Sequence, residues 1–277
     1  MLELPESTNL SRHLNETVTG LTIVSAKANH SPHSFTWYEG DPASYSEALP
    51  GRALEGAVTR GGRVDLLLGG GLRLSLMDGV NLRLLTADAP RPAKHQLLLE
   101  LSDGRALSAT VQMYGGIMLY PRDEDMNFYD AVARQSPSPL TDAFDRAHFD
   151  GLVGAAKPTL SAKALLATEQ RIPGLGNGCC QDILFIAGIH PQSHIGALSR
   201  TQMAGLYTSI KETLAQMAAL GGRDTEKDLH GRAGGYKTLL SAKTLAAPCP
   251  KCGGAIVRKA YLGGNVYFCP TCQPLQK

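Results

Sequence analysis

The sequence predicts an α+β protein with an N-terminal helix, an antiparallel sheet region that is expected to form a sandwich, a helical region and a metal-binding hairpin. Three observations predict this fold class. Leu10, Leu14 and Val18 recur at helical spacing near the start of the chain. Short runs of β-forming residues separated by turn residues fill residues 52–120. Two pairs of cysteines close the chain, and its 277 residues are long enough for about two domains.

The helix is expected from about Pro5 to Val18, and the sheet is expected to follow it directly. Gly69-Gly70-Gly71 and Asp103-Gly104 supply the turns between neighbouring strands. The strands most clearly marked by alternating or apolar residues are Arg63–Leu68, Leu72–Met77 and Gln96–Leu101.

A change of pattern at Ser136-Pro137-Ser138-Pro139 reads as a linker, and the chain after it reads as helical up to Gly222. Ser161 is placed to cap one helix, and Ser199 with Gln202 forms a capping-box pattern at the start of another. Gly221-Gly222 is placed to end that second helix. Its apolar stripe is expected to be core and comprises Met203, Leu206, Ile210, Leu214 and Met217.

Charge is unevenly distributed along a chain whose formal net charge is only +2. Residues 226–277 hold eight Lys/Arg against two Asp/Glu, whereas residues 1–60 hold four against seven. A basic tail on a nearly neutral body is typical of proteins with a polyanionic partner. A solvated surface explains the same pattern, so charge alone leaves both interpretations open.

The chain shows no signal for a membrane or for export. No apolar run reaches the ~18 residues that a membrane-spanning helix needs. The first ten residues carry Glu3 and Glu6 and no basic residue, unlike a secretory signal peptide. A cytoplasmic protein with reduced cysteines is therefore expected, associated with the nucleoid if the chain is bacterial.

Four cysteines near the end have the spacing of a zinc site. Cys249 and Cys252 form one CxxC pair, and Cys269 and Cys272 form a second pair sixteen residues later. A hairpin between two such pairs brings four thiolates around one tetrahedral Zn²⁺, and such a closed site is structural. A disulfide or redox pair is the alternative, but a reducing compartment disfavours it. One zinc per chain is predicted, whereas Cys179 and Cys180 lack metal spacing and are expected to be buried thiols.

A glycine-rich turn, Ile172–Gly178, precedes the apolar helix segment Ile183–Ile186. Backbone N–H groups at the start of a helix can hold a phosphate, because they point outward together and the helix dipole favours an anion. A simple turn between two helices explains the same residues. The local sequence on its own favours the simple turn over a phosphate site.

Taken together, the motifs resemble the formamidopyrimidine-DNA glycosylase/endonuclease VIII family over essentially the whole chain. The resemblance rests on separate motifs that occur in the family's order. These motifs are Leu2–Glu6, Ile172–Gly178, Gln181–Phe185, Ala187–Pro191 and Cys269–Gln273. The family resemblance implies a two-domain clamp with a helix–two-turn–helix module and a zinc-finger β-hairpin. It gives expected boundaries of 1–135 for the helix and sandwich, 136–142 for the linker, 143–244 for the helical module and 245–277 for the finger.

The resemblance also implies a catalytic mechanism that starts at the first residues. In the family the N-terminal amine, usually of proline, attacks the sugar C1′, a Schiff base forms and β-elimination nicks the strand. An α-amine suits this role because its pKa of roughly 8 leaves part of it neutral at physiological pH. Glu3 matches the family's catalytic acid and Glu6 a second acidic residue, although both are also ordinary charges for a helix N-terminus. Leu2 stands where the family has proline, and a retained Met1 would displace the amine by up to ~3.5 Å.

Several DNA contacts follow from the same resemblance. Asn177 matches the asparagine that contacts a phosphate, and Arg63 aligns with a phosphate-binding lysine of the sheet domain. The finger arginine of the family falls near Gly264 or Asn265, so Arg258 and Lys259 are the basic residues that can compensate. Tyr114-Gly115-Gly116 resembles the segment that fills the gap left by an everted nucleotide. Tyr114, Met113 or Met77 could supply the inserted side chain, although core packing explains the two methionines equally well.

Two functions are therefore carried forward. The first is a base-excision-repair DNA glycosylase and AP lyase that acts as a monomer on damaged or abasic double-stranded DNA. The second is a catalytically impaired zinc-containing protein that binds damaged or distorted DNA, favoured by the departures at the proline, lysine and arginine positions. A zinc-ribbon protein that binds RNA or another protein is a third option, disfavoured because the helical module also matches the family.

Overall fold

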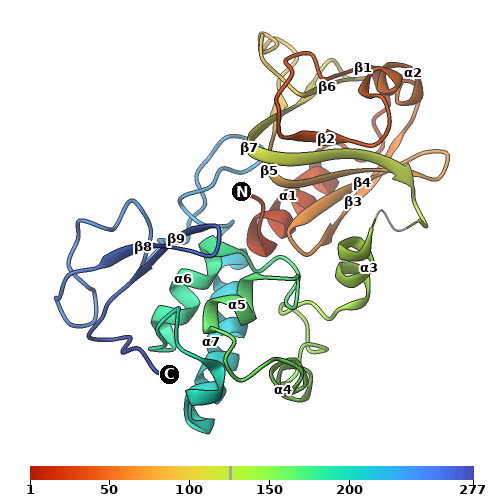
Figure 1. Ribbon diagram of the computed structural model, residues 1–277. Helices are drawn as coiled ribbons and strands as arrows, with labels where there is room; N and C mark the ends of the chain where they lie inside the picture. Colours follow the sequence, from red (N-terminus) through yellow and green to blue (C-terminus); the bar gives the residue numbers. More distant parts are fainter. Residues whose placement is uncertain (125–126) are drawn as a thin grey trace.

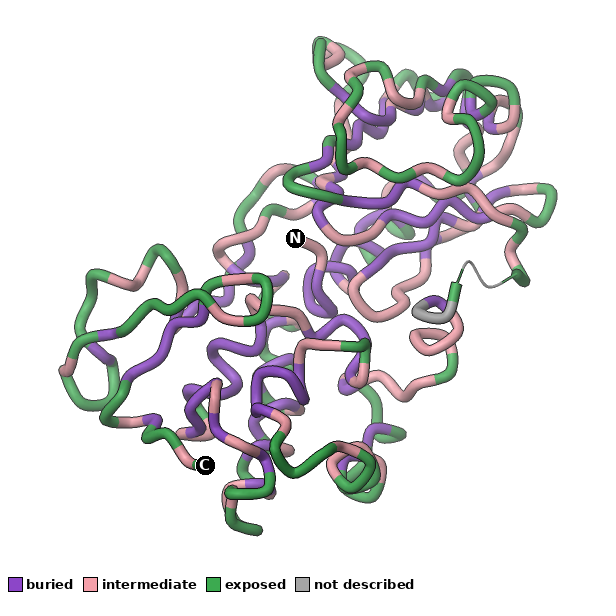
Figure 2. The backbone as a smooth tube through the Cα atoms, in the orientation of Figure 1, coloured by how far each residue is buried: buried purple, intermediate pink, exposed green. Residues whose placement is uncertain are grey.

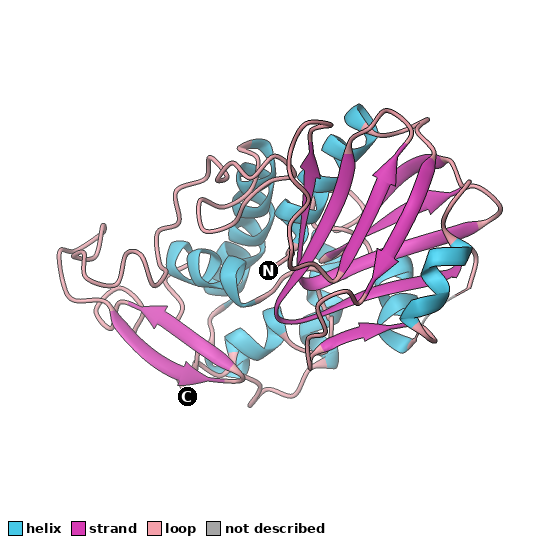
Figure 3. Cartoon of the chain, turned by 90° about the horizontal axis from the view of Figure 1, so that it is seen from above, coloured by secondary structure: helices cyan, strands magenta, loops and turns pink. Residues whose placement is uncertain are grey.

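The computed structural model describes residues 1–124 and 127–277 and shows two modules joined through the N-terminal helix. A seven-stranded sheet forms the first module, and helices with a two-stranded hairpin form the second (Figure 1). Viewed from above, the sheet and the hairpin lie at opposite ends of the molecule (Figure 3). In the described ranges, no helix combines the length and the hydropathy needed to cross a bilayer.

Helix α1 (Leu4–Thr17) agrees with the predicted helix to within one residue at each end and belongs to both modules. Leu10 and Leu14 are buried in the core of the sheet module. Leu4 lies nearer the start of the same helix and is buried instead in the core of the helical module. Leu229 shows the reverse arrangement, because it belongs to the expected helical module (143–244) but is buried in the core of the sheet module. The two modules are thus interlocked at both positions.

The sheet is antiparallel, as predicted, except for one short parallel strand. Its order is β1-β6-β7-β5-β4-β3, and β2 pairs with β7 in parallel. The strands are β1 (Ile23–Ala28), β2 (Thr36–Tyr38), β3 (Leu54–Arg60), β4 (Arg63–Leu68), β5 (Leu72–Leu85), β6 (Leu97–Leu101) and β7 (Ala106–Pro121). A 3-10 turn (Pro42–Ser44) and helix α2 (Tyr45–Ala48) separate β2 from β3.

Two long strands turn this single sheet into the predicted sandwich. The first half of β5 pairs with β4 and with the end of β7, whereas its second half pairs with the start of β7. The register shifts between Asp78 and Val80, which is the position of Gly79. A β-bulge at such a point bends the strand and lets both halves face one core. Apolar residues of both halves are buried in that common core.

The helical module follows a helix that the sequence did not predict. Helix α3 (Phe128–Gln135) begins at Asn127, whose side chain accepts a hydrogen bond from the N–H of Asp130. The predicted linker then leads to four helices and a 3-10 turn. These are α4 (Arg146–Ala155), α5 (Ala162–Ala167), α6 (Asn177–Ile186), the turn Ile195–Ala197 and α7 (Arg200–Ala219).

The predicted helix signals are confirmed at α5 and α7. The Ser161 hydroxyl accepts a hydrogen bond from the N–H of Ala164, and Ser199 with Gln202 forms a complete capping box. Gly221 and Gly222 follow α7 with φ values of 80° and 93°, a conformation in which glycine is favoured. The apolar stripe of α7 is buried, as are Cys179 and Cys180.

The C-terminal hairpin consists of β8 (Val257–Tyr261) and β9 (Gly264–Phe268). Its outer strand and loops are largely exposed, in contrast to the buried helices beside it (Figure 2). Its small core contains Ile256, Tyr267 and Cys269. Phe185 of α6 and Leu240 of the preceding segment pack into the same core. A unit with so few apolar residues needs a further source of stability.

Candidate active site and nucleic-acid interface

The Glu3 carboxylate lies at the N-terminus of α6, at the junction of the two modules. It accepts hydrogen bonds from the backbone N–H groups of Gly176 (3.0 Å), Gly178 (2.8 Å) and Cys179 (2.8 Å). Glu3 is only 3% exposed. Three convergent N–H groups and the positive end of the helix dipole make this position favourable for a buried anion.

This contact decides between the two interpretations of the glycine-rich turn. The turn does present N–H groups to an anion, but the anion is the carboxylate of Glu3. The three N–H groups that Glu3 occupies are therefore already engaged by a carboxylate, which leaves the phosphate interpretation without support at these groups. The turn approaches the sheet module closely, since a side chain at Gly174, where φ is 82°, would strike the backbone of Gly61 and Gly62.

Arg223 completes the surroundings of Glu3 and is a site residue that sequence reasoning missed. Its guanidinium donates to Glu3 Oε1 (3.1 Å) and to both oxygens of Glu6 (3.0 and 2.8 Å), and all three side chains are buried. A Cβ atom at Gly178 would overlap the Arg223 guanidinium, so this packing requires glycine there. The only local signal is an arginine after a helix-ending glycine pair, which does not identify its partners.

The charge state of Glu3 follows from these contacts. Burial alone raises the pKa of a carboxyl group, but here the Arg223 guanidinium and the N–H groups of Cys179 and Gly178 outweigh it. The pKa of Glu3 therefore lies below its ordinary value, and the group is a carboxylate at neutral pH. Glu6, predicted as a site residue or a simple helix charge, is the second anion of the same buried cluster.

The first two residues lie beside this cluster. The amino group of Met1 pairs with Glu226 Oε2 at 2.5 Å, and the N–H of Leu2 donates to the carbonyl oxygen of Asp78 at 2.7 Å. Asp78 has a left-handed backbone (φ 57°) at the bend of β5, and burial raises the pKa of its carboxyl group. The predicted residues Leu2, Glu3 and Glu6 are thus brought together.

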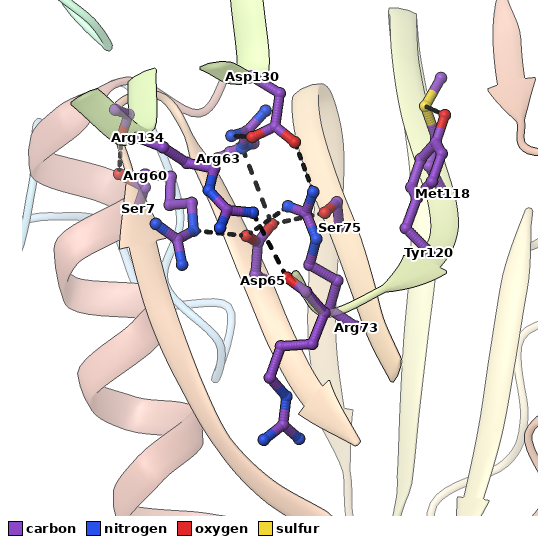
Figure 4. A network of polar contacts seen from close by, with 12 residues as sticks. Ser7, Arg60, Arg63, Asp65, Arg73, Ser75, Met118, Tyr120, Asp130 and Arg134 are labelled. Carbon is purple, nitrogen blue, oxygen red and sulfur yellow. Dashed lines mark hydrogen bonds and ion pairs between the residues drawn. The ribbon is translucent and has the colours of Figure 1, made fainter. Parts of the chain in front are cut away.

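Arg63 lies elsewhere, in a buried network of arginines and aspartates on the sheet (Figure 4). It is 7% exposed, and its guanidinium pairs with Asp130 of α3, so it offers little surface to a phosphate. This placement corrects the expectation of a phosphate contact at Arg63. The sheet residue that does face the first residues is Gly62, where a Cβ atom would lie 3.0 Å from the Leu2 carbonyl oxygen.

The network around Arg63 is structural in character. Arg73, which is fully buried, donates to Asp65 (2.9 Å) and Asp130 (2.5 Å), and Arg60 donates to Asp65 (2.9 Å) (Figure 4). Asp65 and Asp130 thereby tie strands β4 and β5 to helix α3. Buried charges must be paired in this way, because an unpaired one is costly.

The predicted residues Asn177 and Asn265 meet where α6 contacts the hairpin. The side-chain amide groups of Asn177 and Gln181 both donate to the carbonyl oxygen of Asn265, at 3.1 and 2.9 Å. The N–H of Tyr267 donates in turn to the Gln181 side chain at 3.0 Å. Asn177 therefore joins the glycine-rich turn to the tip of the hairpin.

The remaining predicted DNA-contact residues lie on different modules, on the C-terminal hairpin and on the sheet. Arg258 and Lys259 are exposed on β8, and Lys259 Nζ donates to Gln192 Oε1 at 2.9 Å. Tyr114 lies on β7 of the sheet module and is 36% exposed. The structure does not bring Tyr114 together with the two basic residues, which would have to contact different parts of a long ligand.

The four predicted cysteine ligands form one cluster, in which all Sγ atoms lie within 4.8 Å of one another. The distances are 3.8 Å between Cys249 and Cys272 and 3.5 Å between Cys252 and Cys269. A tetrahedral Zn²⁺ with bonds of ~2.3 Å to sulfur has sulfur–sulfur edges of about 3.8 Å. The donor set and its geometry therefore fit this ion.

Fold and site together define a class of protein: a β-sandwich module and a helical module interlocked by the N-terminal helix, with a buried glutamate at the junction and a four-cysteine hairpin. No protein-family model matches the chain. Individual proteins nevertheless match it over most or all of its length. The formamidopyrimidine-DNA glycosylase of Chloroflexus aggregans is 31% identical over 99% of both chains, and that of Geotalea uraniireducens is 33% identical over 81% of this chain and 83% of its own.

Solved structures give the same result. The Lactococcus lactis Fpg in complex with DNA containing an abasic site matches with a TM-score of 0.81 at 27% identity, over 98% of this chain and 99% of the other. The MutM (Fpg) protein of Thermus thermophilus matches with a TM-score of 0.80 at 26% identity, over 99% of this chain and all of the other. The chain belongs to the formamidopyrimidine-DNA glycosylase family.

Proposed function

We propose that this protein is a DNA glycosylase with AP-lyase activity that acts as a monomer on damaged or abasic double-stranded DNA. The observation that carries the proposal is the meeting of the first two residues, Glu3 and the start of α6 at the junction of the modules. This arrangement belongs to a chain whose relatives are named as DNA glycosylases and whose structural neighbours include complexes with abasic DNA.

The nucleophile in this proposal is the amine of the first residue. Its neutral nitrogen attacks C1′ of the damaged nucleotide, the bond between C1′ and the base breaks, and the base leaves with a proton. The C1′–O4′ bond then opens, O4′ takes a proton from the nitrogen, and the nitrogen lone pair forms the C1′=N double bond of a cationic Schiff base. Loss of a C2′ proton then breaks the C3′–O bond and nicks the strand. If Met1 is retained, its ion pair with Glu226 must open first; if Met1 is removed, the amine of Leu2 lies at the Asp78 carbonyl.

Glu3 has a different role here from that of a proton donor. Arg223 and three N–H groups hold it as a carboxylate, so it contributes a fixed negative charge next to the position of the cationic Schiff base. A preorganised charge of this kind stabilises the developing cation without reorganisation at the moment of reaction. Asn177, Asn265, Arg258 and Lys259 are proposed to contact the DNA backbone from the hairpin side.

A second candidate function, the catalytically impaired DNA binder, is favoured by specific observations. The Met1 amine is engaged by Glu226, the Glu3 carboxylate has no vacant direction toward a substrate proton, and the sheet residue facing them, Gly62, has no side chain. Each of these features lowers the reactivity of the site but leaves the two modules and the hairpin intact.

The four-cysteine cluster is proposed to hold one structural Zn²⁺ through Cys249, Cys252, Cys269 and Cys272. All four ligands come from the protein, which leaves no open position for a substrate. The ion would supply the stability that the small hairpin core lacks, and so fix the hairpin tip against Asn177. Metal analysis of the purified protein should give one zinc per chain.

Borohydride trapping distinguishes the two functions. The protein is incubated with an abasic-site duplex and borohydride, and the crosslinked residue is identified by mass spectrometry. An adduct on the first residue supports the enzyme, whereas tight binding without an adduct or a nick supports the binder. Intact mass of the same sample shows whether Met1 is retained.

A variant pair tests the role of Glu3 in the same assay. Glu3→Gln keeps the size of the side chain but removes its charge, so the rate of adduct formation should fall by about a hundredfold, the loss typical of one preorganised electrostatic group. Glu16→Gln, an exposed position on the same helix, should leave the rate unchanged. Equal rates in Glu3→Gln and the wild type would contradict the proposed mechanism.

A further inference from the structure

A polar cavity of about 250 Å³, which we call the linker cavity, lies where the sheet module, the linker and the glycine-rich turn meet. Its lining includes Thr8 of α1, Arg60 of β3, Arg134 of α3, Ser136 and Ser138 of the linker, and Pro173 of the glycine-rich turn. A space of this size holds about eight water molecules, but it is smaller than a site for a drug-sized ligand. The linker cavity therefore suits a small polar ligand.

The charge of the lining selects the sign of that ligand. Arg60 and Arg134 contribute two guanidinium groups, and none of the lining residues, all of which lie in the described ranges, is acidic. The pocket beside the first residues differs, because Glu6, Glu226 and Asp228 line it. A partly enclosed surface with positive charges and no negative ones attracts an anion.

The buried network behind Arg60 has an excess of positive charge. Its ion pairs join three arginines, Arg60, Arg63 and Arg73, to only two aspartates, Asp65 and Asp130. Arg134 belongs to the same group of side chains (Figure 4). Two carboxylates cannot neutralise three guanidinium groups, and a buried charge without a counter-ion is costly. An anion next to Arg60 would supply the missing negative charge.

Arg63 responds to this excess. Burial and the positive charges of Arg73 and Arg60 lower the pKa of Arg63 to about 10, although the carboxylate of Asp65 opposes them. Its Nε atom is buried and has no hydrogen-bond partner in the part of the chain that the structure describes. The repulsion among the arginines is therefore only partly offset by the two aspartates.

Hydrogen-bond donors reach the linker cavity from two sides. On the sheet side, Arg60 pairs with Asp65 through Nε at 2.9 Å, and within residues 1–124 and 127–277 that is its one hydrogen bond. On the linker side, the Ser138 hydroxyl accepts a hydrogen bond from the N–H of Leu140 (3.3 Å), which leaves its own hydrogen able to donate. Ser136 presents a second hydroxyl from the same segment. All three side chains are half-buried, so a ligand from solvent can reach them.

Among small anions, phosphate matches this set of donors. Its oxygens point in four directions, so it can accept from a guanidinium on one side and from hydroxyl groups on the other. A carboxylate has two oxygens in one plane, which a single guanidinium satisfies, and it would leave the linker serines unused. A metal cation would be repelled by the arginines.

We propose that the linker cavity binds one phosphate group, held by Arg60 from the sheet module and by Ser136 and Ser138 from the linker. Arg134 adds a second positive charge. Pro173 lines the same cavity and packs against Gly61, so a bound phosphate would tie the linker to the contact between the two modules. The phosphate comes from solution or from the backbone of bound DNA. This inference does not depend on the proposed catalysis.

Isothermal titration calorimetry with sodium phosphate, on the full zinc-containing protein without DNA, tests the proposal. One phosphate should bind per chain, whereas sodium chloride of equal ionic strength should give no saturable heat. Acetate should bind at least about tenfold more weakly, because it cannot use the guanidinium and both hydroxyl groups together. No saturable phosphate binding, or equal affinity for acetate, would overturn the inference.

Variants locate the bound ion. Arg60→Gln should weaken phosphate binding by at least about tenfold, since it removes a charged donor. It also removes an ion pair with Asp65, so Ser138→Ala is a second variant, which leaves the arginine network intact and should weaken binding by about threefold. Arg200→Gln, the same substitution at an exposed position at the start of α7, is the matched control. Wild-type affinity in both Arg60→Gln and Ser138→Ala would contradict binding in the linker cavity.

Thermal unfolding gives an independent readout of the same site. Phosphate at about ten times its dissociation constant should raise the melting temperature of the wild type and of Arg200→Gln by about 3 °C. The rise should be smaller in Ser138→Ala at the same concentration. An equal rise in all three proteins would show that phosphate acts elsewhere and would overturn the inference.

Competition with an abasic duplex identifies the source of the phosphate group. If the duplex and inorganic phosphate bind together, the linker cavity takes phosphate from solution; if the duplex displaces phosphate, a phosphate of the DNA backbone enters it. Borohydride trapping remains the separate test of the enzyme. Phosphate binding without trapping would support the linker cavity and count against the enzyme, whereas trapping without phosphate binding would do the reverse.

Discussion

Arg223 shows how much of a site can depend on one side chain. It is buried with Glu3 and Glu6 and joins the start of α1 to the segment after α7. Its role could not be predicted from the sequence, because its partners lie 220 and 217 residues away. The family motif identified the two glutamates as site residues, but it did not predict that they are buried.

Replacing Arg223 with methionine should destabilise the fold strongly. The variant keeps most of the apolar stem but leaves two buried carboxylates without their cation, a change that typically costs about 3–5 kcal/mol. Chemical denaturation measures this loss. Arg12→Met, which removes an exposed ion pair on α1, should cost less than about 1 kcal/mol. Similar losses in both variants would show that Arg223 is not a special contact.

Asp182 on α6 is expected to titrate well above an ordinary aspartate. Burial raises the pKa of Asp182 to about 6 from an ordinary 3.8, although the N–H groups of Leu239 and Leu240 donate to it. The folded chain therefore binds this proton more tightly than the unfolded chain. The group's contribution to stability is complete below pH 3.8 and is lost as the pH rises through 6.

A carboxyl carbon NMR titration tests the Asp182 prediction. A midpoint near 6 is expected, and a midpoint near 3.8 would contradict it. Asp182→Asn should remove this group's part of the pH dependence of unfolding between these values. The pKa could not be inferred from the sequence, which shows Asp182 as the one acidic residue of its helix but not how deeply it is buried.

At the scale of elements, local signals predicted those parts whose causes are local. The strand Arg63–Leu68, the cap at Ser161 and the capping box of α7 all appear as predicted. Helix α3 was missed, since it is short and tied to the sheet by Arg63 and Arg73 through Asp130. Tertiary contacts therefore decide this element, and they also turn Arg63 away from the predicted DNA contact.

Glycine at position 178 should be indispensable to the start of α6. Gly178→Ala places a methyl group in the volume of the Arg223 guanidinium and should cost at least about 2 kcal/mol, as overpacking in a core commonly does. The matched control is Gly205→Ala in α7, where the methyl group meets nothing within 4 Å. That variant should gain up to about 1 kcal/mol through helix propensity. Thermal unfolding of both variants gives the comparison.

Chelation should release the hairpin without unfolding the rest. The hairpin core is small, whereas the helical module has its own large core, so metal removal should act on residues 245–277. Hydrogen–deuterium exchange should increase there and at Asn177 and Gln181, which hold the hairpin tip. Unchanged exchange after complete zinc removal would contradict a structural role for the ion.

At the scale of the whole molecule, the sequence predicted the order of the modules and the resemblance predicted their identity. Neither predicted the exchange of Leu4 and Leu229 between the two cores, because alternation and helical spacing show that a residue is buried but not in which core. The expected boundary at residue 135 therefore divides the sequence into two segments, but the two hydrophobic cores do not follow that division.

Charge at this scale predicts a strong salt dependence of DNA binding. The basic C-terminal part should neutralise several phosphates, so that the logarithm of the affinity falls linearly with the logarithm of salt concentration. Lys259→Ala should reduce that slope by about one unit if the residue contacts a phosphate. Lys157→Ala, on the helical module outside the hairpin, should leave it unchanged. A flat response in the wild-type protein would contradict phosphate binding altogether.

The ion pairs of Arg223 with Glu3 and Glu6 also have a consequence for biosynthesis. As the polypeptide leaves the ribosome, Glu3 and Glu6 emerge first, and more than two hundred further residues must be translated before their cation appears. Until then the first turn of α1 has two uncompensated acidic groups and no core to receive Leu4. The junction that houses the proposed chemistry should consequently be assembled late, once residue 223 has emerged.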